Sequence, residues 1–301
     1  MPRNCRFFGN FGEISLKGRP MDSVTLNAYA KINLYLDITG KRPDGYHTLE
    51  TVMHTVSLCD IVKIEKTAGE TEIICSEPSV PCDKSNIAYK CADAFFEHTG
   101  ISGCGVRISI IKHIPSQAGM GGGSADGAAV LKGLNMLYGT GLSEKELCCI
   151  GVRIGADIPF CITGGCGYCT GIGDIITPIP VLSGTVLIGK GSMGISTRDA
   201  FAAVDSKKLC PPQLNVKEVF ERADIAKISR CCYNAFEAAT DLEEVSDIRD
   251  IMLKNGALCS CMTGSGSAVF GIYTDDRAAD ISMEMLRSKG YFSEICSFIK
   301  G

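Results

Sequence analysis

A glycine-rich segment is the clearest candidate for chemistry in this sequence. Residues 114–129 read IPSQAGMGGGSADGAA and run directly into a pattern typical of a helix. Glycines let the backbone curl tightly and bring its N–H groups close to a ligand. The start of the helix adds unpaired N–H groups and the positive end of the helix dipole. Such a loop binds anions, so we expect a phosphate site here. The alternative is a plain helix start capped by Ser124.

The spacing of these glycines differs from the two common phosphate-binding motifs. A Walker A loop needs a lysine after its last glycine, and no lysine follows Gly123. Gly184, Gly189 and Lys190 have the Walker spacing, but the residues between them, TVLI, are typical of a buried strand. A G-x-G-x-x-G match at residues 189–194 is not followed by a long apolar helix, which argues against a dinucleotide site.

Two charged residues elsewhere are candidates for proton transfer and charge neutralisation. Asp157 lies in GADIPF, beside a proline and among apolar neighbours, so a partly desolvated carboxylate or a turn-capping aspartate is expected. Lys31 and Asn33 alternate with apolar residues in NAYAKINLYL, which puts both on one face of a strand, toward a site or toward water. A lysine beside an aspartate can hold a base ionised and neutralise a transferring phosphoryl group.

Two further loops are candidates for ligand recognition. The turn-rich segment GKRPDGYH ends at Tyr46 and His47, which could stack on a planar ring and bind its polar edge, or simply pack. Residues 263–271, TGSGSAVFG, put small residues ahead of a buried strand, which allows close approach of a ligand or of another loop. The remaining histidines share no metal-ligand spacing with His47, so no metal-ligating residues are predicted.

The elements that must position these residues can be inferred from capping and turn signals. Helices are expected at 86–98, at 276–289, from a capping box at Ser143 and Glu146 to Gly155, and from a second box at Thr240 and Glu243 to Gly256. Strand-like runs occupy residues 24–38, 61–65, 106–111, 186–188 and 268–273. Helices and strands mix without a regular βαβ alternation, so we expect an α+β fold.

Composition excludes several classes of protein. A length of 301 residues predicts one or two domains. The sequence has 30 Lys and Arg against 34 Asp and Glu and no basic block, so no nucleic-acid partner is expected. No apolar run is long enough to cross a membrane, and residues 1–20 lack the apolar core of a signal peptide. We therefore expect a cytoplasmic protein, with no membrane partner, that begins with a poorly ordered extension at residues 1–20.

The seventeen cysteines are expected to be reduced thiols that serve as small core residues, because most lie in apolar segments. Cys161, Cys166 and Cys169 have the spacing of a ferredoxin-type iron–sulfur cluster. The residues between them are typical of strand, tight turn and strand, and a fourth ligand is not specified. A cluster is therefore the weaker interpretation.

Taken together and in this order, the segments resemble the GHMP kinase superfamily. The resemblance is carried by AKINLYLDITGKRPDGYH, PSQAGMGGGSADGAA, GADIPF and TGSGSAVFG. The DGYH at the end of the first segment resembles the motif of one branch of the superfamily. That branch phosphorylates the 2-hydroxyl of 4-diphosphocytidyl-2-C-methyl-D-erythritol in the non-mevalonate isoprenoid pathway. The resemblance implies an ATP- and substrate-binding domain at residues 21–170, similar to ribosomal protein S5 domain 2. It implies a ferredoxin-like domain at residues 171–301, with the active site between the two.

The resemblance also implies roles for residues. Asp157 would be the general base, and Lys31 would lie between the substrate hydroxyl and the γ-phosphate. Asn33 would position the methylerythritol hydroxyls. The cytosine would be bound by Tyr46, His47, Thr197 and Phe201. ATP, with Mg²⁺ bridging its phosphates, would be bound by Pro115, Ser116, Gln117, Ala118, Gly119, Met120, Gly121, Gly122, Gly123, Ser124 and Ala125.

Two alternatives stay open at this point. A GHMP kinase could act on another small alcohol, such as mevalonate or homoserine, and a substrate that lacks cytosine would then be turned over. A catalytically silent nucleotide-binding protein or an Fe–S protein is the second alternative, against which the presence of both Lys31 and Asp157 argues. In every case the partner is a small molecule, and the protein is expected to be a monomer or a homodimer.

Overall fold

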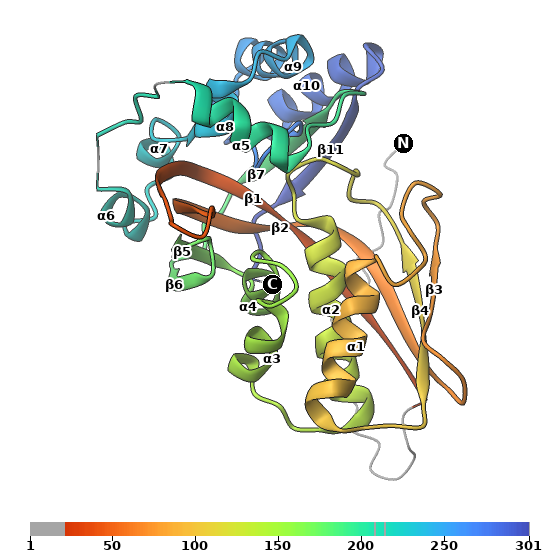
Figure 1. Cartoon of the computed structure of the whole chain (residues 1–301). Helices are drawn as coiled ribbons and strands as arrows, with labels where there is room; N and C mark the ends of the chain where they lie inside the picture. Colours follow the sequence, from red (N-terminus) through yellow and green to blue (C-terminus); the bar gives the residue numbers. More distant parts are fainter. Residues whose placement is uncertain (1–21, 208, 214, 301) are drawn as a thin grey trace.

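Two β-sheets partly covered by helices make up the fold (Figure 1). The computed structural model describes residues 22–207, 209–213 and 215–300, and the extension expected at residues 1–20 lies outside this part of the chain. The expected α+β class is confirmed. No helix in the described part is both long and apolar enough to cross a membrane.

The larger sheet has seven strands and is built on two long ones, β1 (Ser23–Lys41) and β2 (His47–Thr67), which pair antiparallel. The edge of β2 that faces away from β1 is shared by two strands, because β5 pairs with its first half and β4 with its second half. The remaining strands are β3 (Glu72–Cys75), β4 (Gly105–Ile111), β5 (Cys166–Thr170), β6 (Ile175–Ile179) and β8 (Tyr233–Asn234).

The alternation in β1 decides what each of its faces contacts. Ile32 and Leu34 point into the apolar core, as the period of two requires. Lys31 and Asn33 lie on the opposite face, as predicted, and they are 4% and 2% exposed. Of the two expectations for that face, a site or water, the burial of both polar side chains therefore favours a site.

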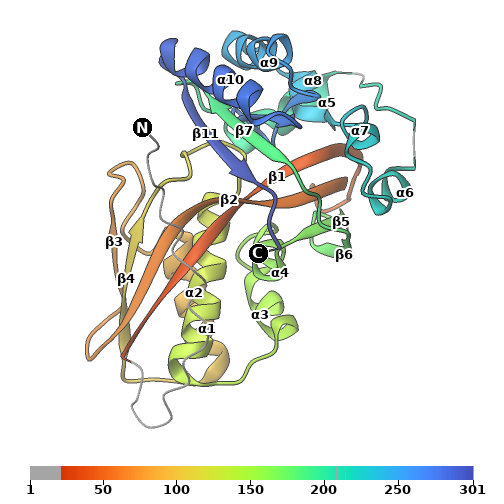
Figure 2. The same cartoon turned by 180° about the vertical axis from the view of Figure 1, so that it is seen from behind.

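Four helices accompany the larger sheet: α1 (Ile87–Thr99), α2 (Gly122–Tyr138), α3 (Glu144–Gly151) and α4 (Ile158–Thr163). Figures 1 and 2 show α1 and α2 side by side, and α2 packs directly on β1 and β2. The capping box at Ser143 and Glu146 is confirmed, but α3 ends at Gly151, four residues before the expected stop.

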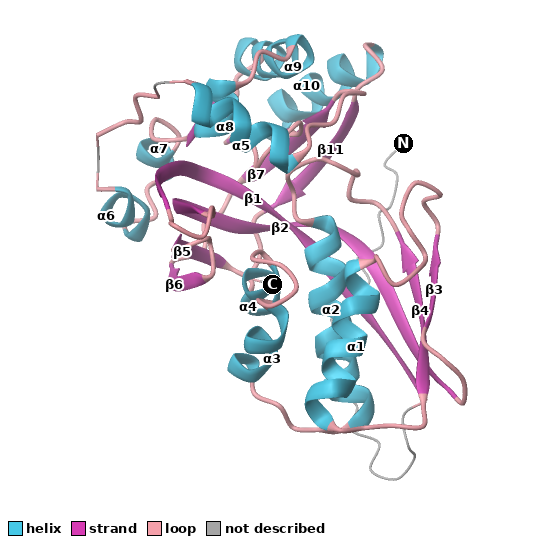
Figure 3. Ribbon diagram, in the orientation of Figure 1, coloured by secondary structure: helices cyan, strands magenta, loops and turns pink. Residues whose placement is uncertain are grey.

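The smaller sheet has the antiparallel order β11-β7-β10-β9. Its strands are β7 (Thr185–Lys190), β9 (Cys259–Met262), β10 (Val269–Tyr273) and β11 (Phe292–Ser297), and α9 (Glu243–Lys254) and α10 (Asp276–Ser288) pack against it (Figure 3). The chain order β-α-β-β-α-β is that of a ferredoxin-like fold, as expected. The helices between β7 and α9 are α5 (Thr197–Ser206), α6 (Val216–Glu221), α7 (Ile225–Ile228) and α8 (Ala235–Ala239).

The alternation in β7 and β10 joins the two halves of the molecule. Ile188 and Phe270 belong to the same apolar core as Ile32 and Leu34 of the larger sheet. Their neighbours Leu187 and Val269 point the other way and belong to a second core with residues of α9 and α10. The smaller sheet is therefore buried on both faces. The predicted division between residues 170 and 171 stays a prediction; β5 and β6, on either side of it, both pair within the larger sheet.

Two local predictions were wrong. The capping box at Thr240 and Glu243 does not form: Leu242 is the N-cap of α9, and the Thr240 hydroxyl instead donates to Phe236 O (2.6 Å) at the end of α8. Cys161 lies on helix α4 rather than on a strand, because Pro159 at the second position of α4 starts a short helix there.

A buried histidine ties β2 to the segment that leads into β7. His54 is fully buried; its Nδ1 lies 2.9 Å from Thr55 O, and its Nε2 accepts from the Leu182 N–H (3.0 Å). Since Nε2 is the acceptor, the single proton of the neutral ring must be on Nδ1. Burial lowers the pKa of His54 to about 4.

This pKa predicts an acid-sensitive fold. Histidine in the unfolded chain has a pKa of about 6.5, so on acidification the unfolded state takes up the proton first. The unfolding free energy therefore falls as the pH drops below about 6.5, until the pH reaches the pKa of the folded state. We expect His54 to account for a loss of about 2 kcal/mol in unfolding free energy between about pH 7.5 and pH 5. Urea unfolding at the two pH values measures it. The loss should shrink in His54→Gln and persist in His98→Gln, which alters an exposed histidine; equal pH dependence in all three proteins would contradict the assignment.

Candidate active site

The glycine-rich loop is fixed at both ends and open in its middle. The Lys31 N–H donates to Met120 O (3.1 Å), which bonds the loop to β1. Gly121 is the N-cap of α2 in a left-handed conformation (φ 68°), and no side chain of a described residue hydrogen-bonds to the first-turn N–H groups. Ser124 lies within the first turn, so it is not the cap. The loop therefore keeps the free donors that an anion site needs.

The loop at residues 263–271 lies against the glycine-rich loop, as its small residues predicted. The Ser267 and Ala268 N–H groups donate to Gln117 O (3.3 Å) and Ala118 O (3.2 Å). On its other side the Thr263 hydroxyl accepts from the Asn33 N–H (2.9 Å). The two loops and β1 therefore form one hydrogen-bonded unit.

Two glycines make this contact possible. Gly119 (φ 71°) and Gly264 (φ 54°) meet backbone to backbone, and a Cβ on Gly119 would overlap Thr263 O, while one on Gly264 would overlap Gly119 O. Both are also in the left-handed region, where side chains are disfavoured. Backbone atoms cannot move aside as the end of a side chain can, so these positions require glycine.

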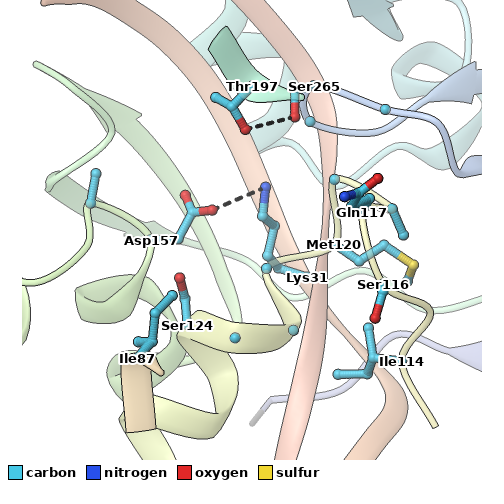
Figure 4. A pocket seen from close by; sticks show the side chains of 18 of the residues that line it. Lys31, Ile87, Ile114, Ser116, Gln117, Met120, Ser124, Asp157, Thr197 and Ser265 are labelled. Atoms are coloured by element: carbon cyan, nitrogen blue, oxygen red, sulfur yellow. Dashed lines mark hydrogen bonds and ion pairs between the residues drawn. The ribbon is translucent and has the colours of Figure 1, made fainter. Parts of the chain in front are cut away.

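Lys31 and Asp157 come together beside the loop (Figure 4). Lys31 Nζ lies 3.5 Å from Asp157 Oδ2 and donates to Asn33 Oδ1 (2.7 Å). The Asn33 amide in turn donates to the Thr51 hydroxyl (2.8 Å). A Cβ on Gly121 would lie 3.2 Å from Lys31 Cε and 3.7 Å from Asp157 Oδ2, so the start of α2 adjoins both charged groups.

The carboxylate of Asp157 makes no hydrogen bond to another residue that the structure describes. It occupies the N-cap position of α4, with Pro159 behind it, but its side chain makes no capping hydrogen bond. Its side chain is 35% exposed, whereas that of Lys31 is 5% exposed. The turn-capping interpretation therefore fails, and the carboxylate remains available to a ligand.

These groups line a cavity of about 610 Å³. Most of the predicted site residues border it, namely Lys31, Asn33, Pro115, Ser116, Gln117, Ala118, Gly119, Met120, Gly121, Gly122, Gly123, Ser124, Asp157, Thr197 and Phe201. Ala125 does not, because its side chain is buried in the core.

Tyr46 and His47, predicted to bind cytosine, also lie outside the lining. Tyr46 is 62% exposed. His47 stacks on the ring of Phe201, which does border the cavity (centroids 4.6 Å apart, planes at 12°).

Sequence reasoning missed a buried ion cluster beneath the loop. Lys112 Nζ donates to Asp126 Oδ2 (2.7 Å) and to Asp60, and all three side chains are nearly inaccessible. Burial raises the pKa of Asp126 to about 7 against the opposing effect of Lys112. The cluster joins β2 to the N-terminal part of α2. Lys112 lies just before the glycine-rich segment at residues 114–129, and Asp126 lies within it. Asp60 is distant in the sequence, and nothing around it indicated a link to the loop.

The structure also bears on the iron–sulfur cluster considered for Cys161, Cys166 and Cys169. No three His, Cys, Asp or Glu side chains among residues 22–207, 209–213 and 215–300 gather in a metal-binding arrangement. All sixteen cysteines of this part of the chain are free thiols, and Cys91, Cys166, Cys169, Cys259, Cys261 and Cys296 are buried.

Comparison with known proteins identifies this architecture. Residues 86–165 match the profile "GHMP kinases N terminal domain", and residues 216–291 match "GHMP kinases C terminal". The fold and the glycine loop are thus those of a GHMP kinase.

Individual relatives narrow the family. The 4-diphosphocytidyl-2-C-methyl-D-erythritol kinase of Acetivibrio thermocellus is 40% identical over 274 residues, 89% of this chain and 96% of the relative. That of Caldicellulosiruptor saccharolyticus is 42% identical over 258 residues, 83% and 88% of the two chains. A crystal structure of 4-(cytidine 5'-diphospho)-2C-methyl-D-erythritol kinase superposes with a TM-score of 0.77 at 28% identity, over 92% of this chain and 100% of that one.

The chain therefore belongs to the GHMP kinases and, within them, to the family of the 4-diphosphocytidyl-2-C-methyl-D-erythritol kinases. A homoserine kinase from Cytophaga hutchinsonii shares the fold, with a TM-score of 0.72 at 18% identity over 93% of this chain and 96% of that one. The Fe–S and non-catalytic alternatives are accordingly not supported.

The contact between the two loops predicts different effects for two glycine substitutions. Gly119→Ala should weaken ATP binding at least about tenfold, because the added methyl group overlaps a backbone carbonyl and displaces the loop. Gly139→Ala is the matched control: it lies at the other end of α2 with φ 61°, and nothing lies within 4 Å of its Cβ position. The control should lose about 1 kcal/mol of stability from strain alone. Calorimetric ATP titration and thermal unfolding measure both effects; equal ATP affinity would contradict the prediction.

Proposed function

We propose that this chain is an ATP-dependent kinase that phosphorylates the 2-hydroxyl of 4-diphosphocytidyl-2-C-methyl-D-erythritol in the non-mevalonate isoprenoid pathway. The observation that carries the proposal is the approach of Lys31 and Asp157 to the start of α2. A cation, a free carboxylate and uncapped helix N–H groups are what an in-line phosphoryl transfer to an alcohol needs at one point. The names of relatives about 40% identical over most of the chain support the substrate.

We assign the chemical roles as follows. Asp157 accepts the proton of the substrate hydroxyl, because its carboxylate is free and borders the cavity. Lys31, held by Asn33, neutralises negative charge on the oxygens around the transfer. Asn33 positions the hydroxyls of the substrate from the same face of β1.

The residues of the loop fit ATP and Mg²⁺. The segment from Pro115 to Ala125 would surround the phosphates of ATP, with the free N–H groups of the loop and of the start of α2 as donors. Mg²⁺ keeps several waters and binds phosphate oxygens with one or two protein oxygens, so it needs no protein cage. Ser124 borders the cavity, and its hydroxyl makes no hydrogen bond to another described residue, so it could supply such an oxygen. When bound, Mg²⁺ supplies charge neutralisation between the phosphates.

We also propose an oligomeric state and a cellular compartment for the enzyme. We propose that the enzyme acts on its small-molecule substrate as a monomer or a homodimer. The free thiols of the described cysteines support a reducing compartment, and we propose the cytoplasm.

The proposed activity is tested by ADP release in a coupled assay. Turnover is expected with 4-diphosphocytidyl-2-C-methyl-D-erythritol and not with methylerythritol phosphate, mevalonate or homoserine. Turnover of mevalonate or homoserine in its place would keep the kinase and overturn the substrate.

The role of Asp157 predicts a specific kinetic defect. Asp157→Asn removes the proton acceptor at nearly constant size, so kcat should fall by roughly 10²–10⁴ while ATP affinity stays nearly unchanged. Asp93→Asn, which removes an exposed charge on α1, is the control and should behave like the wild type. A variant at residue 157 with near wild-type kcat would exclude Asp157 as the base.

A further inference from the structure

The tip of the β1–β2 hairpin is fastened to helix α5 by one carboxylate. Lys41, at the end of β1, donates to Asp205 Oδ2 (2.5 Å), and His47 Nε2, at the start of β2, lies 2.7 Å from Asp205 Oδ1. Asp205 belongs to α5, one turn beyond Phe201. Each carboxylate oxygen therefore has its own partner on the hairpin.

This contact leaves His47 with one unpaired ring nitrogen. One face of the imidazole stacks on Phe201, and the Nε2 edge meets Asp205. The ring is only 9% exposed, so its orientation is fixed by both contacts. Nδ1 makes no hydrogen bond to any residue that the structure describes. It is therefore the polar ring atom left for a ligand, beside Phe201, which borders the cavity.

The charge state of Asp205 decides which nitrogen carries the proton. Hydrogen bonds from Lys41 and His47 lower the pKa of Asp205, so it is an ionised carboxylate that can only accept. His47 Nε2 must then donate, and in the neutral ring Nδ1 is left with a lone pair. Carboxylates fix the tautomer of metal-binding histidines in the same way.

We propose that Asp205 is a positioning residue that holds His47 in the Nε2–H form and thereby makes the site selective for a base with an exocyclic amino group. This inference rests on the proposed function and on the role that the family resemblance implies for His47, namely binding of the cytosine. The Nδ1 lone pair accepts a hydrogen bond from the amino group of cytosine. It opposes the carbonyl oxygen that uracil presents at the same position, because two acceptors then face each other. Sites that depend on a hydrogen bond discriminate strongly against the ligand that cannot form it.

A second interpretation gives Asp205 a purely mechanical role, in which it only fastens the hairpin to α5. Lys41 separates the two interpretations. Lys41→Met removes one of the two fastening bonds but leaves the contact between Asp205 and His47. Asp205→Ala removes the bonds to both Lys41 and His47. Asp205→Asn keeps the shape of the side chain, but its amide can either accept from Nε2–H or donate to Nε2. Asp205 is 41% exposed, so these variants should fold.

The test compares kcat/KM for 4-diphosphocytidyl-2-C-methyl-D-erythritol with that for its uridine diphosphate analogue. We expect Asp205→Ala to lower the cytidine-to-uridine ratio by roughly 10-fold to 100-fold, mostly through KM of the cytidyl substrate. The ratio for Asp205→Asn should lie between those of the wild type and of Asp205→Ala. Lys41→Met should keep the wild-type ratio. An unchanged ratio in Asp205→Ala, or an equal loss in Lys41→Met, would overturn the proposal.

A second measurement examines the tautomer without any substrate. Long-range ¹H–¹⁵N spectra of histidine-labelled protein distinguish Nε2–H from Nδ1–H directly. Wild-type His47 should be in the Nε2–H form, and Asp205→Ala should show a mixture; an Nδ1–H wild type or an unaltered variant would overturn the role of Asp205. A wild-type enzyme that fails to turn over the cytidyl substrate would instead refute the proposed function, while the spectra still decide the role of Asp205.

Discussion

The buried ammonium group of Lys31 is the constraint on which the site depends. A charge removed from water is stable only if it is paired and hydrogen-bonded. Lys31 satisfies this through Asn33 and Asp157, and Asn33 is satisfied in turn through Thr51. These partners come from β1, β2 and the segment before α4. The requirement to compensate one cation therefore fixes the relative positions of three elements that are distant in the sequence.

The glycine loop completes this arrangement through its backbone. Because Gly119 and Gly264 have no side chains, the loop can lie against residues 263–271 and bond to β1 at the same time. Its first-turn N–H groups have no partner among the described side chains and adjoin the buried ammonium group of Lys31. The proposed phosphate site and the ammonium group of Lys31 are thus adjacent for a steric reason.

The two halves of the molecule are held by an ordinary alternation of apolar residues. Ile188 and Phe270 pack toward the larger sheet, and Leu187 and Val269 pack toward α9 and α10. A strand buried on both faces cannot shift register without exposing one apolar set. Asn33 and Thr263, which belong to different sheets or their loops, are kept in hydrogen-bonding distance by this packing.

Much of the local structure could be predicted because its causes are local. The alternation around Lys31 gave the face of β1, Ser143 and Glu146 gave the start of α3, and the small residues at 263–271 gave the close approach of a loop. The failures have local causes too. Thr240 bonded backward to the end of α8 instead of forward to α9, and Pro159 started a helix where a strand was expected.

The sequence by itself determined the kinds of chemistry available: a phosphate loop, a lysine, an aspartate and a family resemblance. It could not determine which polar groups satisfy one another, because hydrogen bonds across long sequence separations leave no local pattern. Asp60 beneath the loop and Asp205 beside His47 are ordinary aspartates in the sequence. Only the tertiary structure makes one a partner of Lys112 and the other a partner of a ring nitrogen, since packing of distant elements sets which charge meets which donor.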